Sequence, residues 1–200
     1  MNTLEAIRAR RAVKHYDPNF QIPEKDIAEL KDLIRQTPSS FNIQNWRILS
    51  IEDPELRKKV RAVAWDQAQV TDASHVFLVC GDLKAWDQDP ARYWETAPQE
   101  AQDFLIPAIK NFYEGREWQQ RDEVMRSAGL AGQTLMVAAK AMGYESCPMI
   151  GFDPDALAEL IKLPENYLIG MMIAVGKGVE PARPKGGYIP DEEVFFTDTF

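Results

Sequence analysis

The segment Ser127–Met142 constrains the fold of this chain more than any other, because it is apolar on most of its helical circumference. It is rich in Ala, Leu and Met, which favour a helix, and Gly143 follows it as a stop signal. A helix that is apolar on nearly all sides is buried in a core. A chain of 200 residues can bury such a helix without disulfides or a metal. The sequence therefore predicts one domain, residues 1–200, with this helix at its centre.

Short apolar runs and helix starts predict the other elements. Strands are expected at Trp46–Ile51, Val76–Cys80 and Tyr167–Val175. Further helices are expected after Thr3 as an N-cap, at Ile22-Pro23 with the proline in the first turn, at Asp53-Pro54 and at Asp153-Pro154. Because strands and helices mix without regular alternation, we expect an α+β fold in which helices wrap a small sheet.

Two segments fit these patterns less well. Residues 84–120 contain three tryptophans and several prolines, with a helical pattern from Glu100 to Tyr113, and we interpret them as a helical excursion or lid. The tail Tyr188–Phe200 is rich in phenylalanine. Such a tail is expected to pack on its own core or on a second subunit, because large apolar patches are rarely left in water.

The composition excludes several classes of function. With 23 basic and 31 acidic residues, the net charge is −8, which argues against nucleic acid and anionic lipid as partners. Two cysteines, Cys80 and Cys147, are too few for a disulfide framework and suit a reducing cytoplasm. We find no export signal and no apolar run near the roughly 20 residues of a membrane span. Two histidines without a Cys/His cluster argue against a zinc site.

Few residues suggest catalysis by a side chain. Cys147 could be a nucleophile only with His15 or His75 as its base, and a buried thiol beside two unrelated histidines is the simpler interpretation. The acidic pairs lie in polar surface stretches, which does not favour a glycosidase-like site. Neither a P-loop nor a dinucleotide-binding glycine fingerprint is present, since Gly176-Lys177-Gly178 lacks the rest of that pattern.

Two polar stretches carry more information, and each has two interpretations. The run Arg10–Lys14 places three cations in five residues of an acidic chain. They either interact with a helix C-terminus, which contributes under about 1 kcal/mol, or bind a phosphate. The stretch Pro38–Trp46 holds two hydroxyls, three amides and a tryptophan. It is either a polar turn or a surface that recognises a heteroaromatic ring with a polar edge.

Four stretches in a set order carry a family resemblance. They are Arg10-Arg11-Ala12-Val13-Lys14 with Tyr16-Asp17, then Pro38–Trp46, then Asp72-Ala73-Ser74, and finally Gly143–Asp153. Together they resemble the motifs of the nitroreductase family of FMN-dependent oxidoreductases. The resemblance runs from residue 4 to about residue 190.

The resemblance implies a mostly antiparallel sheet in an intertwined homodimer, with FMN at the subunit interface and the Phe-rich tail reaching across the other subunit. Cations from both ends of the chain would hold the flavin phosphate, Lys14 would lie near the pyrimidine edge, and backbone groups of Pro148–Gly151 would lie near N5. The implied contacts are Arg10, Arg11, Ala12, Lys14, Asp66, Gln69, Pro148, Met149, Ile150, Gly151, Arg183 and Lys185 of one subunit, with Ser39, Ser40 and Asn42 of its partner.

Some positions depart from the family pattern. Ala12 replaces the usual Ser and Asn45 the usual Pro, while Gly186-Gly187-Tyr188 stands where many members have arginines. Asp66 and Gln69 occupy positions where many members have Asn and a basic residue at the flavin edge. An acid there would lower the potential of the flavin unless its carboxylate points away.

The function that the resemblance implies is hydride transfer in two alternating steps, from NADH or NADPH to FMN and then to a quinone or nitroaromatic acceptor. Residues 84–120 would shape the acceptor pocket, and no side chain is expected to act as nucleophile or general acid. Two alternatives stay open. One is a reductase or dehydrogenase of a specific small metabolite on the same fold, and the other is a flavin-binding stress-response module with little turnover.

Overall fold

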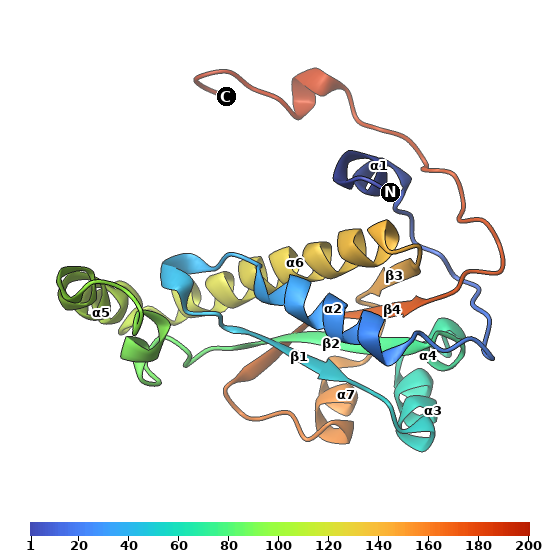
Figure 1. The fold of residues 1–200 in the computed structure, drawn as a ribbon, viewed down its shortest axis with the longest axis horizontal. Helices are drawn as coiled ribbons and strands as arrows, with labels where there is room; N and C mark the ends of the chain where they lie inside the picture. The colour runs from blue at the N-terminus through green and yellow to red at the C-terminus, as the bar shows by residue number, and fades with distance from the viewer.

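The computed structural model describes residues 1–200, which form a four-stranded antiparallel sheet covered by helices (Figure 1). The strand order is β1-β2-β4-β3, so β2 and β4 lie inside and β1 is an edge strand. The strands are β1 Trp46–Ser50, β2 His75–Asp82, β3 Glu145–Met149 and β4 Tyr167–Gly176. The helices are α1 Thr3–Ala9, α2 Glu24–Arg35, α3 Pro54–Val63, α4 Gln69–Asp72, α5 Gln99–Tyr113, α6 Glu117–Ala141 and α7 Pro154–Leu160. The predicted α+β class and antiparallel sheet are confirmed.

The two inner strands are apolar on both faces, because both faces of the sheet are covered. Along β2, Val76, Leu78 and Cys80 pack into one core, and Phe77 and Val79 pack into the other. Strand β4 alternates between the two cores in the same way. Successive side chains of a strand point to opposite faces, so a strand between two cores must be apolar throughout. This is why both strands were recognisable as apolar runs.

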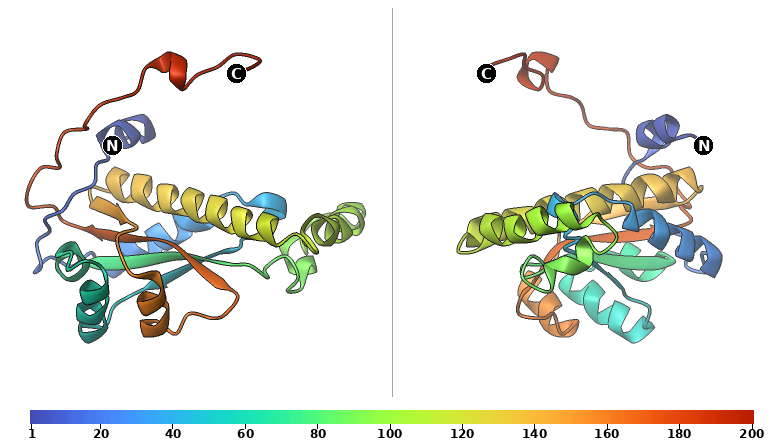
Figure 2. Two further views of the ribbon diagram at one scale, coloured as in Figure 1. Left: turned by 180° about the vertical axis from the view of Figure 1, so that it is seen from behind. Right: turned by 60° about the vertical axis from the view of Figure 1, so that its left-hand side comes forward.

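The helices form a layer on each face of the sheet (Figures 1 and 2). Helices α2 and α6 pack against one face, and α3, α4 and α7 pack against the other. Helix α1 lies beside the C-terminal end of α6, where the terminal ammonium of Met1 donates to the carbonyl oxygen of Ala141 (3.2 Å). The helix expected at Ser127–Met142 is part of α6, and Gly143 follows its end with φ +93°. The helix is not at the centre of the core as expected, because it covers one face of the sheet and leaves Leu130 exposed on its outer side.

The helix starts agree with the sequence signals except at two positions. Asp53 and Asp153 cap α3 and α7 through their side chains, each followed by proline in the first turn. Helix α1 is capped by Asn2 rather than by the predicted Thr3, because Asn2 and Glu5 form a reciprocal capping box. Pro23 is the N-cap of α2 and so lies just outside its first turn.

Three features of the fold differ from the expected elements. Helix α6 begins at Glu117, ten residues before Ser127. This start was not expected because the first turns are polar, although Gln120 and Glu123 in them are buried. Strand β3 was not predicted, since a five-residue strand containing Ser and Pro has no apolar alternation. The four-residue helix α4 is too short for a periodic signal.

Of the two segments without a clear pattern, residues 84–120 pack into the fold and the tail Tyr188–Phe200 does not. The expected helical pattern from Glu100 to Tyr113 is confirmed as α5, which carries Ile109 and Tyr113 into a small separate core with Ile43 and Trp86. The tail beyond β4 extends away from the sheet, and Phe200 is fully exposed (Figure 1). The tail therefore does not pack on its own core. No helix is long and apolar enough to cross a membrane.

Candidate active site

A cavity of about 1140 Å³ lies beside α1, β3 and the start of the tail, and its charge is all of one sign. Its lining contains no acidic residue, although acidic residues outnumber basic ones in the chain as a whole. The thirteen lining residues are Ile7, Arg8, Arg10, Arg11, Ala12, Lys14, Gln67, Gln69, Pro148, Arg183, Pro184, Lys185 and Tyr188. Six cations that converge on one cavity attract an anion.

The end of α1 and the segment after it position the first group of cations. The Nη1 of Arg11 donates to the carbonyl oxygens of Arg8 (2.7 Å) and Arg10 (2.8 Å), which are free at the helix end. Beyond the helix, the chain runs alongside β3, where Val13 donates its amide to the carbonyl oxygen of Ser146 (3.1 Å). The interpretation as a helix C-terminus contact is confirmed for Arg11, which also lines the cavity, and phosphate binding by the run stays a prediction.

The floor of the cavity is formed by β3 and α4. The Nε2 of Gln69 lies 3.3 Å from the sulfur of Met149 and 4.0 Å from the thiol of Cys147. Burial raises the pKa of the Cys147 thiol, while the Lys14 ammonium and the Gln69 amide act in the opposite direction. A protonated, buried thiol is not a nucleophile, which agrees with the simpler interpretation of Cys147.

One wall is formed by the turn between α3 and α4, in which Trp65 and Asp66 have left-handed backbone conformations. The turn directs Gln67 into the cavity, where its Nε2 donates to the carbonyl oxygen of Gly151 (2.9 Å). A Cβ at Gly151 would lie 2.7 Å from the ring of Trp65, so a larger residue here would displace this ring. Gln67 was missed by the sequence analysis, because nothing in the residue types marks this turn as left-handed.

The structure does not bring Asp66 into the group that lines the cavity. Its carboxylate is largely exposed and accepts a hydrogen bond from the Nε of Arg61 (2.7 Å). Arg61 is held in turn by a bond from its Nη1 to the hydroxyl of Thr71 (2.9 Å). The carboxylate of Asp66 therefore points away from the cavity, which is the orientation in which an acid at this position would not lower the potential of a bound flavin.

The far end of the cavity comes from the segment after β4. Arg183 and Lys185 lie there as expected, and the ammonium of Lys185 lies 3.9 Å from the ring centroid of Tyr188. Of the other expected residues, Ala12, Gln69 and Pro148 line the cavity. Met149 is buried behind it in contact with Gln69, and Ile150 is exposed beside Gly151 at its edge.

The expected residues Ser39, Ser40 and Asn42 lie elsewhere in the chain. The amide of Ser40 donates to Glu123 (3.4 Å) near the start of α6, whereas α1 contacts the last turn of the same helix through Met1 and Ala141. The 18 residues between these contacts correspond to about 27 Å along the helix axis. In Figure 1, α1 and the turn that precedes β1 lie toward opposite ends of α6. Within one chain, the two groups do not meet.

Comparison with known proteins identifies the family. A sequence model of the nitroreductase family matches residues 7–177. The chain belongs to the nitroreductase family. Among the relatives of this nitroreductase, Protein DrgA of Synechocystis is 53% identical over 185 residues, which cover 92% of this chain and 88% of that protein. YodC of Bacillus subtilis, named as a proposed NAD(P)H nitroreductase, is 35% identical over 91% of this chain and 92% of that protein.

Solved structures agree with this assignment. A proposed nitroreductase of Exiguobacterium sibiricum, solved in complex with FMN, matches this nitroreductase with a TM-score of 0.91 and 30% identity, over 99% of this chain and 98% of that one. The proposed nitroreductase ydfN of Bacillus subtilis matches with a TM-score of 0.90 and 30% identity, over 97% of both chains. The resemblance found in the sequence motifs is therefore confirmed over nearly the whole molecule.

Proposed function

We propose that this nitroreductase binds FMN in the basic cavity and transfers hydride from NADH or NADPH to quinone or nitroaromatic acceptors. The observation that carries the proposal is the gathering of six cations and no acid around one cavity of an acidic chain. A flavin phosphate carries about two negative charges, so several cations are needed to neutralise it. The FMN complex of the Exiguobacterium relative supports the same cofactor.

The residues that line the cavity fit the cofactor in chemistry as well as in charge. For the phosphate, Arg10, Arg11 and Arg183 supply guanidinium groups, each able to donate two hydrogen bonds to it, and Lys185 supplies an ammonium group. Gln67 and Gln69 supply amides that can contact the polar edge of the ring. When bound, FMN supplies the group that accepts and returns a hydride, and the protein supplies orientation and electrostatics.

Lys14 has the role most directly connected with electron transfer. Its ammonium lies on the cavity wall and close enough to affect the Cys147 thiol, above the floor formed by β3. A fixed positive charge there stabilises the negative charge that develops on a ring during reduction. Asp66, held toward Arg61, does not oppose this effect. No nucleophile or general acid from the chain is required.

The proposed active form is a homodimer. The Ser39–Asn42 group can reach the basic cavity only from a second copy of the chain, because about 27 Å of α6 separates the two within one copy. Electron donor and acceptor would then use the same open face of the site in turn, as two alternating half-reactions require.

The tail supplies a second argument for the dimer. It carries four acidic residues and exposed aromatic side chains, and every residue beyond Tyr188, which lines the basic cavity, is exposed in its own chain. A groove of about 690 Å³ between α2 and the edge strand β1 is complementary to it, being basic and aromatic without any acid. The cationic and aromatic residues of this groove are Lys31, Arg35, Arg47, Arg92, Trp46, Phe77 and Tyr93. We propose that the tail of one subunit covers the partner along this side.

The test is a titration of the purified chain with FMN, followed by assays of NADH and NADPH oxidation with a quinone and with a nitroaromatic compound. We expect yellow protein with one FMN per subunit and turnover that depends on the acceptor. An Arg183→Ala variant should bind FMN about tenfold more weakly, which corresponds to about 1.4 kcal/mol. Protein that cannot be loaded with FMN would overturn the proposal.

The same assays separate the two alternatives. FMN-loaded protein that ignores quinones and nitroaromatics but reduces another small metabolite would be a substrate-specific reductase on this fold. Tight FMN binding without oxidation of either nicotinamide would indicate a flavin-binding module. Asp66 and Gln69, which replace the usual Asn and basic residue at the flavin edge, are the features that keep this second alternative open. Asp66 points away from the cavity and so does not support it, whereas Gln69 lines the cavity.

A further inference from the structure

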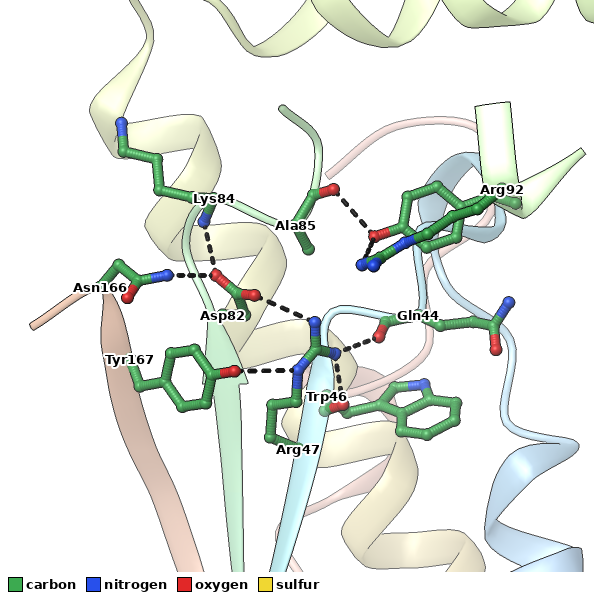
Figure 3. Close-up of polar contacts among 10 residues, drawn as sticks. Gln44, Trp46, Arg47, Asp82, Lys84, Ala85, Arg92, Asn166 and Tyr167 are labelled. Carbon is green, nitrogen blue, oxygen red and sulfur yellow. Dashed lines mark hydrogen bonds and ion pairs between the residues drawn. The ribbon is translucent and has the colours of Figure 1, made fainter. Parts of the chain in front are cut away.

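A carboxylate outside the basic cavity is buried at the centre of a polar network (Figure 3). The side chain of Asp82, at the end of β2, is fully buried and forms an ion pair with Arg47 (3.0 Å). It also accepts hydrogen bonds from the amide of Lys84 (2.9 Å) and from Nδ2 of Asn166 (2.7 Å). A buried charge of this kind is kept only when all its bonding positions are satisfied.

Arg47 connects this carboxylate to the turn before β1. Its Nη1 donates to the carbonyl oxygens of Gln44 (2.7 Å) and Trp46 (3.0 Å), as Figure 3 shows. The backbone amide of Asp82 donates to the carbonyl oxygen of Asn45 (2.8 Å). The start of β1 is therefore anchored to Asp82 through both its side chain and its backbone.

The turn that is anchored in this way has an unfavourable backbone. Phe41, Asn42 and Gln44 all have positive φ angles between 41° and 54°. Residues other than glycine remain in this region only where the surroundings hold them. Within the turn, the amide of Gln44 donates to the hydroxyl oxygen of Ser39 (2.8 Å). The turn thus needs external anchors to present Ser39–Asn42 in one conformation.

The same carboxylate anchors the segment that leads into α5. Beyond Lys84, the carbonyl oxygen of Ala85 accepts a hydrogen bond from the hydroxyl of Tyr93 (2.9 Å), which Figure 3 also draws. This segment bonds directly to the turn, because Asn42 donates to the carbonyl oxygen of Tyr93 (3.0 Å) and Trp94 donates to that of Phe41 (3.0 Å). The contacts close a ring that starts and ends at Asp82.

We propose that Asp82 is a positioning residue that orders the 39–45 turn and the 84–94 segment as one unit. The inference rests on the proposed function, in which the turn contacts the flavin of the partner subunit, and on the expectation from the family resemblance that residues 84–120 shape the acceptor pocket. Asp82 touches neither ligand. Through Arg47 and Lys84 it keeps both parts in the conformation that the two binding events need.

The experiment compares Asp82→Asn with the wild type in two measurements. Hydrogen–deuterium exchange of FMN-free protein should show faster exchange in both segments 39–45 and 84–94, with residues 145–149 unchanged. FMN titration should show a dissociation constant raised about tenfold or more. Faster exchange in only one of the two segments, or unchanged FMN affinity when both are loosened, would overturn the proposal.

A matched control separates positioning from general stability. Asp26→Asn removes a carboxylate in the first turn of α2 that accepts a hydrogen bond from Tyr144 (2.5 Å) and bonds to neither segment. This variant should lower Tm without changing either FMN affinity or exchange in the two segments. If it weakens FMN binding as much as Asp82→Asn at an equal loss of Tm, the effect of Asp82 is structural only and the proposal fails.

A second variant keeps the test valid if Asp82→Asn does not fold. Trp94→Phe removes the hydrogen bond to Phe41 and leaves the ion pair in place. It should loosen the same two segments and weaken FMN binding in the same direction. Wild-type protein that binds no FMN would instead contradict the proposed function, while the exchange measurement on FMN-free protein would still decide whether the two segments are coupled.

Discussion

At the scale of single residues, Lys14 shows how a local charge can matter in a chain of opposite net charge. Lys14 is exposed on the cavity wall. Its positive charge partly opposes the rise that burial causes in the pKa of the neighbouring Cys147 thiol. Asp66 lies near the same cavity but is committed to Arg61. The electrostatics of the site therefore depend on which side chains the backbone turns inward.

Lys14→Met is expected to weaken FMN binding and to lower the flavin midpoint potential, because the positive charge that favours the reduced ring is lost. A loss of about 1.4 kcal/mol corresponds to about 30 mV for a two-electron couple. The potential is measured by equilibration with reference dyes. Lys25→Met, an exposed change on α2, is the control, and an equal potential shift in both variants would refute the role of Lys14.

His75 is expected to make stability depend on pH. Burial lowers the pKa of His75 below its ordinary value of 6.5, and its ring stacks on Phe77. The unfolded chain then binds a proton more readily than the folded one, so the free energy of unfolding falls as pH drops below 6.5. Urea unfolding at several pH values should show a shallower decline in His75→Gln. His15→Gln, at the other, exposed histidine, should retain the decline.

At the scale of elements, α6 connects the parts of the proposed site. Its first turns contact the Ser39–Asn42 turn through Glu123, its middle packs on the sheet, and its end contacts α1. One glycine within this helix and one on the strand beneath it differ in the space available for a larger side chain. A Cβ at Gly129 would meet nothing within 4 Å, whereas a Cβ at Gly81 of β2 would lie 2.4 Å from Val124 of the helix.

Gly129→Ala is therefore expected to stabilise the protein by about 0.5–1 kcal/mol, because alanine favours a helix and has room here. Gly81→Ala is expected to destabilise it by about 1–3 kcal/mol through overpacking between β2 and α6. Urea denaturation of the two variants measures both effects. Changes of the same sign would contradict the contacts described at these positions.

At the scale of the whole molecule, the basic cavity and the Ser39–Asn42 turn lie at opposite ends of α6, and the tail is exposed along its length. Both features are expected of a subunit in a homodimer, where a second copy supplies the missing site residues and covers the exposed tail. Obligate dimers bury large apolar areas, and the exposed side chains of the tail supply such an area. The exposed apolar residues of the tail are Tyr188, Ile189, Val194, Phe195, Phe196 and Phe200.

Removing residues 189–200 is expected to raise the dimer dissociation constant by at least about tenfold and to weaken FMN binding with it. Sedimentation velocity at several protein concentrations measures the first effect. A full-length variant with the tail phenylalanines replaced by serine, keeping Asp191, Glu192 and Glu193, separates apolar from charged contributions. A truncated chain that dimerises and binds FMN like the full-length chain would refute the role of the tail.

Much of the fold could be predicted because single segments carried the information. The strands β2 and β4 lie between two cores and contain continuous apolar runs, and Asp-Pro pairs marked the starts of α3 and α7. The start of α6 and the strand β3 could not be predicted, because their residues are stabilised by contacts with distant parts of the chain. The polar residues from Glu117 to Glu123 favour a helix but show no apolar period, and Pro148 is disfavoured in strands.

The sequence by itself determined the family, the α+β class and the basic run after α1, because these follow from local patterns and ordered motifs. Only the tertiary structure decided which side chains face the cavity, since one left-handed turn directs Gln67 inward and leaves Asp66 with Arg61. It also decided that one chain separates its two groups of site residues. The orientation of a side chain depends on the conformation of the turn that carries it, and the separation of two groups depends on distances across the fold. Neither can be read from the types of neighbouring residues in the sequence.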